Sequence, residues 1–391
     1  MVWWFSVPKV AFGEDALTEL DQLKGQRAII VTDRVVADLG YPAKVESMLK
    51  NNGWEVTVWA EAESDPRVSV VKSAADAMTK SSADLIVAIG GGSVMDTAKA
   101  AWVLYVNPGF KLEELTPFDT LNLRSKARLV CIPTTAGTGS DATKAIVVRE
   151  DDTGRKFATI NPELTPDLAI LEPTFVKDLP KTMTAYTGMD ALTHAVESYA
   201  SVWKNDFSDA CSMKAVTMVF EWLPKSMSEP HNLLAREKML VAANLAGMSF
   251  GNSQVSLAHS LGHSLGSVLR VQHGLAVGIS LPYTIEYNSA ENEATARLYQ
   301  ELGRLVGVLE PDPFKAARAF AAKVRELQKM TGFPRSLKEA GVKRTDFDKG
   351  LDKLVEYAMM DSSITMNPRD IQSAGIRRLY DAMFEGRPID F

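Results

Sequence analysis

Histidine is rare in this chain: all five residues lie between positions 194 and 273, and four of them are candidates for one cluster. These four are His194, His259, His263 and His273. Asp190 and His194 stand four residues apart in MDALTHAVESY, and His259 and His263 repeat that spacing in LAHSLGHSLG. Each pair therefore shares one face of a predicted helix. Three imidazoles and a carboxylate suit Zn²⁺ or Fe²⁺, so the group predicts a metal site, although any single histidine is better read as a core or surface residue.

A glycine-rich segment, IGGGSVMDTAK (89–99), follows a predicted buried strand and precedes a predicted helix. Glycine lets the backbone approach a phosphate closely, and a helix N-terminus aims unpaired N–H groups at it. Ser93 is a candidate N-cap, with Asp96 three residues later in the position of a capping box. The segment predicts phosphate binding, and the alternative is a tight turn before a well-capped helix.

Two further features follow predicted strands. The segment PTTAGTGSDATK (133–144) is dense in hydroxyls and glycines, and it either faces a nucleotide or forms a polar surface loop. Asp33 follows RAIIVT, where a carboxylate can accept hydrogen bonds from ribose hydroxyls. Because Asp33 precedes the glycine segment, the standard Rossmann pattern is absent, and the residues alone favour helix capping for Asp33.

The elements that must position these residues alternate along the first half of the chain. Short apolar runs, each typical of a buried strand, alternate with segments of helical periodicity such as 67–80. This alternation predicts a parallel sheet covered by helices on both faces. The apolar start, 1–10, lacks a basic leader and is read as a first strand. Compact apolar runs predict further strands at 27–32, 54–59, 84–89, 129–132, 145–148 and 167–171.

Helical periodicity continues alone from about Lys181 to the end of the chain. We therefore predict two domains, 1–180 and 181–391, with a site in the cleft between them. The length of 391 residues fits two or three domains.

Composition excludes several classes of protein. Hydrophobic residues make up 46% and charged residues 24%, as is ordinary for a globular chain. The net charge of −6 gives no bulk attraction to nucleic acid or to an anionic membrane, and no apolar run reaches the roughly 18 residues of a membrane span. Two cysteines, Cys131 and Cys211, cannot build a disulfide framework and fit a reducing cytoplasm.

Together, five motifs resemble those of the iron-containing, or group III, alcohol dehydrogenases. The resemblance runs through almost the whole chain and is strongest from about 84 to 285. It implies an α/β N-terminal dinucleotide-binding domain with a mostly parallel sheet, followed by an all-helical metal-binding and catalytic domain. The implied metal is divalent, with Fe²⁺ preferred and Zn²⁺ as the alternative. The motifs are GGGSVMDTAKA, PTTAGTGSD, GMDALTHAVESYAS, AHSLGHSLG and QHGLAVGISLP.

The resemblance also implies roles for individual residues. His263 matches a family histidine near the nicotinamide that does not bind the metal, and it is a candidate for positioning or proton relay. Asp33 matches the position that meets the adenosine ribose in NAD-using members, which reverses the capping interpretation. The implied metal ligands are Asp190, His194, His259 and His273. The remaining implied cofactor contacts are Gly91, Gly92, Ser93, Asp96, Thr134, Thr135, Thr138, Lys156, Leu179 and Met183.

The implied reaction is reversible hydride transfer between NAD(H) and a small alcohol–aldehyde pair. A homo-oligomer, dimeric or larger, is expected, and neither nucleic acid nor membrane is expected as a partner. The chain departs from many family members at Asp141 and at Glu172-Pro173, where they have Glu and Asp-Pro, and it follows the family less closely near its C-terminal end.

Three alternative functions are weighed against this reaction. A metal- and NAD-dependent lyase or cyclase similar to dehydroquinate synthase needs many basic residues for a phosphorylated substrate, and the loops around 190–200 and 255–275 offer mainly Arg270. A metal hydrolase is the second alternative, although the spacing lacks the glutamate of the zincin motif. A non-catalytic nucleotide-binding protein is the third.

Overall fold

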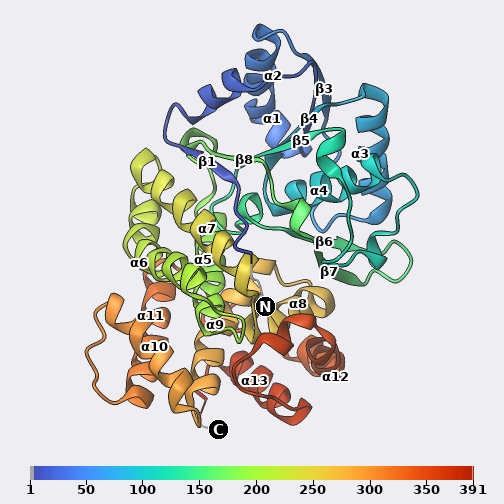
Figure 1. Cartoon of the computed structure of the whole chain (residues 1–391). Helices are drawn as coiled ribbons and strands as arrows, with labels where there is room; N and C mark the ends of the chain where they lie inside the picture. The colour runs from blue at the N-terminus through green and yellow to red at the C-terminus, as the bar shows by residue number, and fades with distance from the viewer. Residues whose placement is uncertain (1–3, 390) are drawn as a thin grey trace. The chain divides into compact units, whose positions relative to one another are not determined.

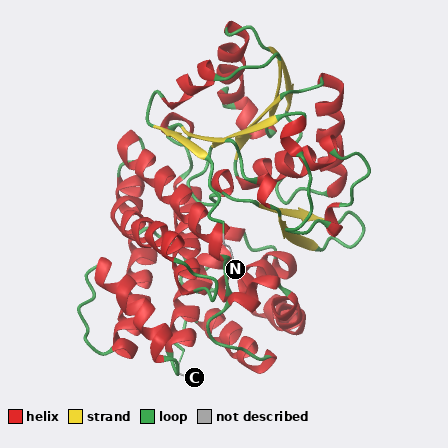
Figure 2. Cartoon of the chain, in the orientation of Figure 1, coloured by secondary structure: helices red, strands yellow, loops and turns green. Residues whose placement is uncertain are grey.

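The computed structural model describes residues 4–389 and residue 391. The chain divides into two compact units, Met1–Leu179 and Pro180–Phe391. Among the described residues, every strand lies in the first unit, and the second unit is built from helices (Figure 2). The switch from alternating apolar runs to helical periodicity therefore corresponds to a switch in architecture.

The centre of the first unit is a six-stranded, entirely parallel sheet with the strand order β1-β8-β5-β4-β2-β3 (Figure 1). All six residues of β4 are buried, which explains why its sequence is a continuous apolar run. In the register of β4 with β5, Gly90 stands opposite Pro133. The strands are β1 (Lys9–Phe12), β2 (Arg27–Val31), β3 (Glu55–Trp59), β4 (Leu85–Gly90), β5 (Arg128–Pro133) and β8 (Leu168–Leu171).

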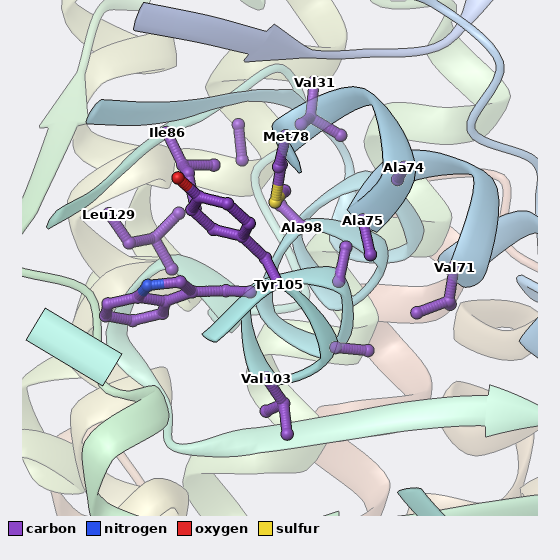
Figure 3. Close-up of a cluster of buried hydrophobic side chains, with 14 of the residues drawn as sticks. Val31, Val71, Ala74, Ala75, Met78, Ile86, Ala98, Val103, Tyr105 and Leu129 are labelled. Atoms are coloured by element: carbon purple, nitrogen blue, oxygen red, sulfur yellow. The ribbon is translucent and has the colours of Figure 1, made fainter. Parts of the chain in front are cut away.

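Helices cover both faces of this sheet because successive strand side chains point to opposite sides. On one face, α3 (Val68–Ser81) and α4 (Gly92–Val106) pack on alternate residues of β2, β4 and β5, and Figure 3 shows Met78 and Ala98 in this cluster. The opposite face is covered by three elements, which are η1 (Ala16–Gln22), α1 (Arg34–Asp38) and α2 (Tyr41–Asn51).

Two strand predictions need correction. The strand expected at 145–148 exists as β6 (Ala145–Arg149), but it pairs antiparallel with β7 (Lys156–Ile160) and does not join the parallel sheet. Its residues are buried in alternation, as in a hairpin with one face on the core. The strand expected at 1–10 begins only at Lys9, and residues 1–3 lie outside the described residues.

The long helices of the second unit include several that are buried on most sides. From Thr184 onward nearly all of α5 is buried, and α6, α7 and α9 pack around it. A helix that is buried on nearly all sides in this way belongs to the interior of its unit, where its polar side chains need partners. None of the helices in the described part of the chain has the length and apolarity needed to span a membrane.

The helices of the second unit are α5 (Lys181–Ala200), α6 (Asp206–Ser228), α7 (Leu233–Ser253), α8 (Leu257–Leu269), α9 (His273–Ser289), α10 (Glu293–Leu305), α11 (Pro313–Met330), α12 (Arg344–Met360) and α13 (Ser373–Glu385), with the short η7 (Ser362–Met366) before α13. Besides η1, the described part of the first unit has five shorter 3₁₀ helices, which are η2 (Leu112–Glu114), η3 (Leu123–Ser125), η4 (Ser140–Ala142), η5 (Pro162–Leu164) and η6 (Pro173–Phe175).

Candidate active site

Three helices of the second unit bring the four predicted metal ligands together. Asp190 and His194 lie one turn apart on α5, His259 lies on α8, and His273 is the first residue of α9. One potential ligand atom from each residue lies within 4.8 Å of all the others. Asp190 Oδ1 is 3.5 Å from His273 Nε2, 3.7 Å from His194 Nδ1 and 3.9 Å from His259 Nε2.

These distances fit a shared metal ion. Two donors that each bind a metal at about 2.1 Å can be at most about 4.2 Å apart, and the three distances from Asp190 meet this limit. Asp190 Oδ1 and His259 Nε2 are also buried with no hydrogen-bond partner among the described residues. Since buried polar atoms are normally paired, a cation bound between them would supply the missing interaction.

The charges of the cluster are unusual for a buried site. Burial raises the pKa of the Asp190 carboxyl to about 7, although His259 and His263 lower it. Burial lowers the pKa of His259, but Glu197 and Asp190 raise it by more, so the net shift is upward. The cluster thus holds acidic and basic groups out of water, an environment in which a divalent cation can take the place of bound protons.

Glycines allow the three helices to approach one another. A Cβ on Gly274 of α9 would lie 2.5 Å from the backbone oxygen of Tyr186 and 3.4 Å from Cβ of Asp190. A Cβ on Gly262 of α8 would lie 2.5 Å from Cγ1 of Val277. A backbone oxygen cannot rotate out of the way, so α9 can lie this close to Asp190 only with glycine at 274.

Gly274→Ala is therefore expected to push α9 away from α5 and to weaken metal binding by about tenfold, with a loss of about 1–3 kcal/mol in the free energy of unfolding. Chelator competition and thermal unfolding measure the two effects. Gly266→Ala is the matched control, because its Cβ would meet only the oxygen of Val271, at 3.4 Å. Equal metal affinity in both variants would contradict this account of the helix packing.

His263 lies beside the cluster and is not one of its four members. It follows His259 by one turn of α8, and its ring is stacked near that of His273 with 5.4 Å between centroids. Its Nδ1 is 2.8 Å from Oδ2 of Asp361, which also accepts a hydrogen bond from the Ser363 N–H. Burial opposes the charge on Asp361, but His263 and these hydrogen bonds lower the pKa of that carboxyl well below its usual range.

The glycine segment begins helix α4, but one detail of the prediction was wrong. Gly91 occupies the N-cap and the helix starts at Gly92, so Ser93 lies inside the first turn and does not cap it. There is no capping box either, because Asp96 accepts hydrogen bonds from Ser140 Oγ and from the Val147 N–H. Two glycines ahead of Ser93 allow the turn to enter the helix earlier than a serine cap would.

The hydroxyl-rich loop packs directly on the glycine segment. The Thr134 N–H donates a hydrogen bond of 3.0 Å to the oxygen of Gly90. A Cβ on Gly91 would lie 3.5 Å from Thr135, and one on Gly92 would lie 3.0 Å from Thr138. The two segments therefore form one structure at the carboxyl end of β4 and β5, with the three threonines beside the start of α4.

Lys99 holds the hydroxyl-rich loop in place. It is fully buried, and its Nζ donates to the backbone oxygens of Ser140 and Thr143 at 2.6 and 2.8 Å. Burial lowers the pKa of Lys99, an effect that Asp96 partly opposes. In turn, burial raises the pKa of Asp96 to about 6 despite the attraction of Lys99. The sequence offered no signal for this role beyond the lysine's place in GGGSVMDTAK.

Asp33 lies at a point where ligands commonly bind in open α/β sheets. β2 and β4 are neighbours, but the chain runs from β2 outward to β3 on one side and from β4 to β5 on the other. Ligands bind at the carboxyl ends of strands at such a switch point. Asp33 follows β2 there, and its Oδ1 accepts a 2.9 Å hydrogen bond from the Val36 N–H. Helix capping is thus present, and the ribose contact stays a prediction.

The structure places the remaining predicted residues with different partners. Lys156, on β7, forms an ion pair with Asp65, whose N–H donates to Ser93 Oγ at 3.4 Å. Asp65 was not predicted, and its only signal is the turn sequence SDP. Leu179 ends the first unit and Met183 lies in the first turn of α5, so their cofactor contacts stay predictions.

The family models cover both units of the chain. Residues 8–173 match the model of "iron-containing alcohol dehydrogenase", and residues 184–384 match that of "Fe-containing alcohol dehydrogenase family, C-terminal". The chain belongs to the iron-containing alcohol dehydrogenase family. This confirms the family and the fold class predicted from the sequence, and it does not favour the lyase or cyclase alternative.

Individual family members are similar over nearly all of the chain. The NADPH-dependent butanol dehydrogenase of Clostridium saccharobutylicum is 33% identical over 390 residues, which cover 99% of both chains. The bifunctional aldehyde-alcohol dehydrogenase AdhE of Escherichia coli K12 is 37% identical over 396 residues, which cover 94% of this chain but only 44% of AdhE. The chain thus spans less than half the length of AdhE.

Solved structures of the family share the fold closely. A 1,3-propanediol oxidoreductase and an alcohol dehydrogenase from Oenococcus oeni each superpose with a TM-score of 0.90 at 30% identity. In both cases the match covers 98% of this chain and 100% of the other. An α/β unit followed by a helical unit is therefore a fold that this chain shares with solved alcohol dehydrogenases.

Proposed function

We propose that this chain is a metal-dependent alcohol dehydrogenase that transfers a hydride reversibly between NAD(H) and a small alcohol–aldehyde pair. The observation that carries the proposal is the convergence of one buried carboxylate and three imidazoles in a member of this family. The glycine segment at the switch point of the parallel sheet supports dinucleotide binding.

The metal is proposed to be held by Asp190, His194, His259 and His273, with Fe²⁺ preferred and Zn²⁺ as the alternative. A bound divalent metal supplies Lewis acidity toward an alcohol or carbonyl oxygen. The single carboxylate neutralises part of the cation's charge, and the three imidazoles bind it in their neutral form.

The cofactor is proposed to bind at the start of α4, where the backbone N–H groups of Gly91, Gly92 and Ser93 would hold its pyrophosphate. Thr134, Thr135 and Thr138, beside this helix start, offer hydroxyls to the cofactor. The hydride chemistry belongs to the nicotinamide, and the chain supplies orientation and electrostatics. A bound nicotinamide would supply the acceptor for the hydride that leaves the alcohol carbon, and its reduced form would supply the hydride for the reverse reaction.

His263 is proposed to move the proton. Its Nδ1 is held by Asp361, so its Nε2 remains to take the alcohol's hydroxyl proton during oxidation and to return it during reduction. The His263 side chain is 22% exposed, which gives that proton a way out to solvent. The Asp361 carboxylate stabilises the imidazolium that forms during the transfer.

His263→Ala is expected to retain the metal and to lower kcat by about tenfold, because water can partly replace a proton relay. Metal content and kcat are measured on the same preparation. A matched control is Asp361→Asn, which keeps a polar partner for His263 and is expected to lower kcat less. Loss of the metal in His263→Ala would instead make His263 a ligand and contradict the assignment.

Choice between NAD and NADP is proposed to depend on Asp33. Relatives do not settle it, since the butanol dehydrogenase is named NADPH-dependent, whereas a sulfoacetaldehyde reductase from Bifidobacterium kashiwanohense, 26% identical, was solved with NAD⁺. A carboxylate at the end of β2 accepts hydrogen bonds from ribose hydroxyls and repels a 2′-phosphate. We therefore propose NAD as the cofactor.

The proposed function is tested with a panel of short alcohols and aldehydes in the presence of NAD(H) or NADP(H), before and after Fe²⁺ or Zn²⁺ is added. Net formation of NADH from an alcohol, or its consumption by an aldehyde, is the expected result. The absence of any net change in NADH across the panel with metal-loaded protein would contradict the proposal.

Location and assembly are proposed from the sequence. Cys131 and Cys211 are both free thiols, which supports a reducing cytoplasm. The homo-oligomer implied by the resemblance stays a prediction, and light scattering of the purified chain measures it.

A further inference from the structure

A second buried carboxylate lies beside the candidate metal ligands. Glu197 follows Asp190 by seven residues on α5, which places the two carboxylates two turns apart on the same side of that helix. The Glu197 side chain is only 4% exposed. It is not one of the four clustered ligand candidates, so the proposed mechanism gives it no task.

Both oxygens of Glu197 are used by the start of α8. Oε2 accepts a hydrogen bond from His259 Nδ1 at 2.5 Å. Oε1 accepts one from Ser256 Oγ at 3.0 Å and another from the Ala258 N–H at 2.5 Å. One side chain on α5 therefore accepts hydrogen bonds from three groups at the N-terminal end of α8, the helix that carries His259.

The bond to His259 determines which ring nitrogen can bind a metal. With Nδ1–H donated to Glu197, the neutral imidazole carries its lone pair on Nε2. That nitrogen faces Asp190, with 3.9 Å between His259 Nε2 and Asp190 Oδ1. A carboxylate behind a ligating histidine fixes both its tautomer and its ring orientation.

The bond to Ala258 determines where α8 begins. The first N–H groups of a helix have no partner within the helix, and the N-cap Ser256 makes no side-chain cap to them. Glu197 supplies that acceptor from another helix, and the negative charge is favourable at this end of the helix dipole. The position of His259 along the helix axis is thereby tied to α5, which carries Asp190 and His194.

We infer that Glu197 is a positioning residue, which holds His259 and the start of α8 in register with α5 so that the four ligands meet. The inference rests on the proposed function, since it concerns affinity for the proposed metal. An amide in place of the carboxylate presents an NH₂ group where one oxygen now accepts hydrogen bonds. Glutamine therefore cannot accept hydrogen bonds from both His259 and the Ser256–Ala258 pair at the same time.

The test compares Glu197→Gln with the wild type and with Glu301→Gln. Glu301 lies on α10 and accepts a hydrogen bond from Tyr199 of α5. Glu301→Gln therefore controls for the removal of a carboxylate that contacts α5 away from the candidate ligands. Affinity for Zn²⁺ is measured by chelator competition, and the visible spectrum of the Co²⁺-loaded protein reports the ligand geometry. We expect Glu197→Gln to weaken Zn²⁺ binding by about 10–100-fold and to alter the Co²⁺ spectrum, and Glu301→Gln to change neither.

The outcomes separate the inference from the proposed function. Failure of the wild type to bind Zn²⁺ or Co²⁺ overturns the proposed function. If the wild type binds Zn²⁺ and Glu197→Gln binds it with less than a tenfold loss of affinity, the role of Glu197 is overturned. A positioning partner is expected to contribute at least tenfold to the affinity. If Glu197→Gln does not fold, Glu197→Asp decides. Its shorter side chain cannot reach all three groups, and unchanged affinity and spectrum in that variant overturn the inference.

Discussion

His259→Ala is expected to remove metal binding and to lower kcat by about a thousandfold or more, because Lewis-acid stabilisation contributes several kcal/mol to the transition state. The variant loses a buried donor, Nε2, from a group in which one ligand atom per residue lies within 4.8 Å of the others. Binding of NADH is expected to persist, because the glycine and hydroxyl-rich segments belong to the first unit. Metal analysis, steady-state kinetics and NADH fluorescence titration measure these three results.

His231→Ala is the control for this experiment, because His231 is the one histidine that is neither a member of the four-residue cluster nor its neighbour His263. It is expected to retain both the metal and the activity. A His259→Ala protein that binds metal as tightly as the wild type would show that the cluster is not the metal site.

Asp33→Gly is expected to improve kcat/KM with NADP by about one to two orders of magnitude, and to cost some affinity for NAD. Two like charges about 4 Å apart oppose each other by about 4 kcal/mol at an effective dielectric near 20, which is an upper guide for a site open to solvent. Salt and water reduce this repulsion, so the wild type is expected to prefer NAD over NADP by about ten- to a hundredfold in kcat/KM. The measurement is kcat/KM for both cofactors in the wild type and the variant.

Asp33→Asn separates the charge of Asp33 from its structural role. Asn caps a helix as well as Asp does, so the bond to the Val36 N–H at the start of α1 is kept. Improved use of NADP is expected in both variants, because both remove the charge. If the wild type already uses NADP as well as NAD, Asp33 does not meet the ribose as proposed.

The features that were predictable from the sequence have short-range signals. The buried strands are continuous apolar runs, and the spacing of four residues in Asp190–His194 and in His259–His263 indicates that each pair shares one face of a helix, α5 or α8. The hairpin of β6 with β7 was missed because a short apolar run does not reveal which partner it pairs with.

The residues that support the site were not predictable for a different reason. Glu197 bonds to His259 across 62 positions, His263 to Asp361 across 98, and Lys99 to Thr143 across 44. Separations of this size leave no pattern in a single sequence, since each partner is an ordinary charged residue until the helices pack. The capping error at Ser93 has a local cause, because Gly91 and Ser93 compete for the same N-cap position.

Hydride transfer by this chain is proposed to depend on one metal ion in the cluster of Asp190, His194, His259 and His273. The most direct test of this dependence is a titration of metal-free protein with Fe²⁺ under anaerobic conditions, with bound metal and NAD-dependent alcohol oxidation measured at every step. The account predicts that turnover rises in proportion to bound metal and reaches its plateau at about one ion per chain. Full turnover in the metal-free protein, or a plateau of bound metal without any turnover, would contradict it.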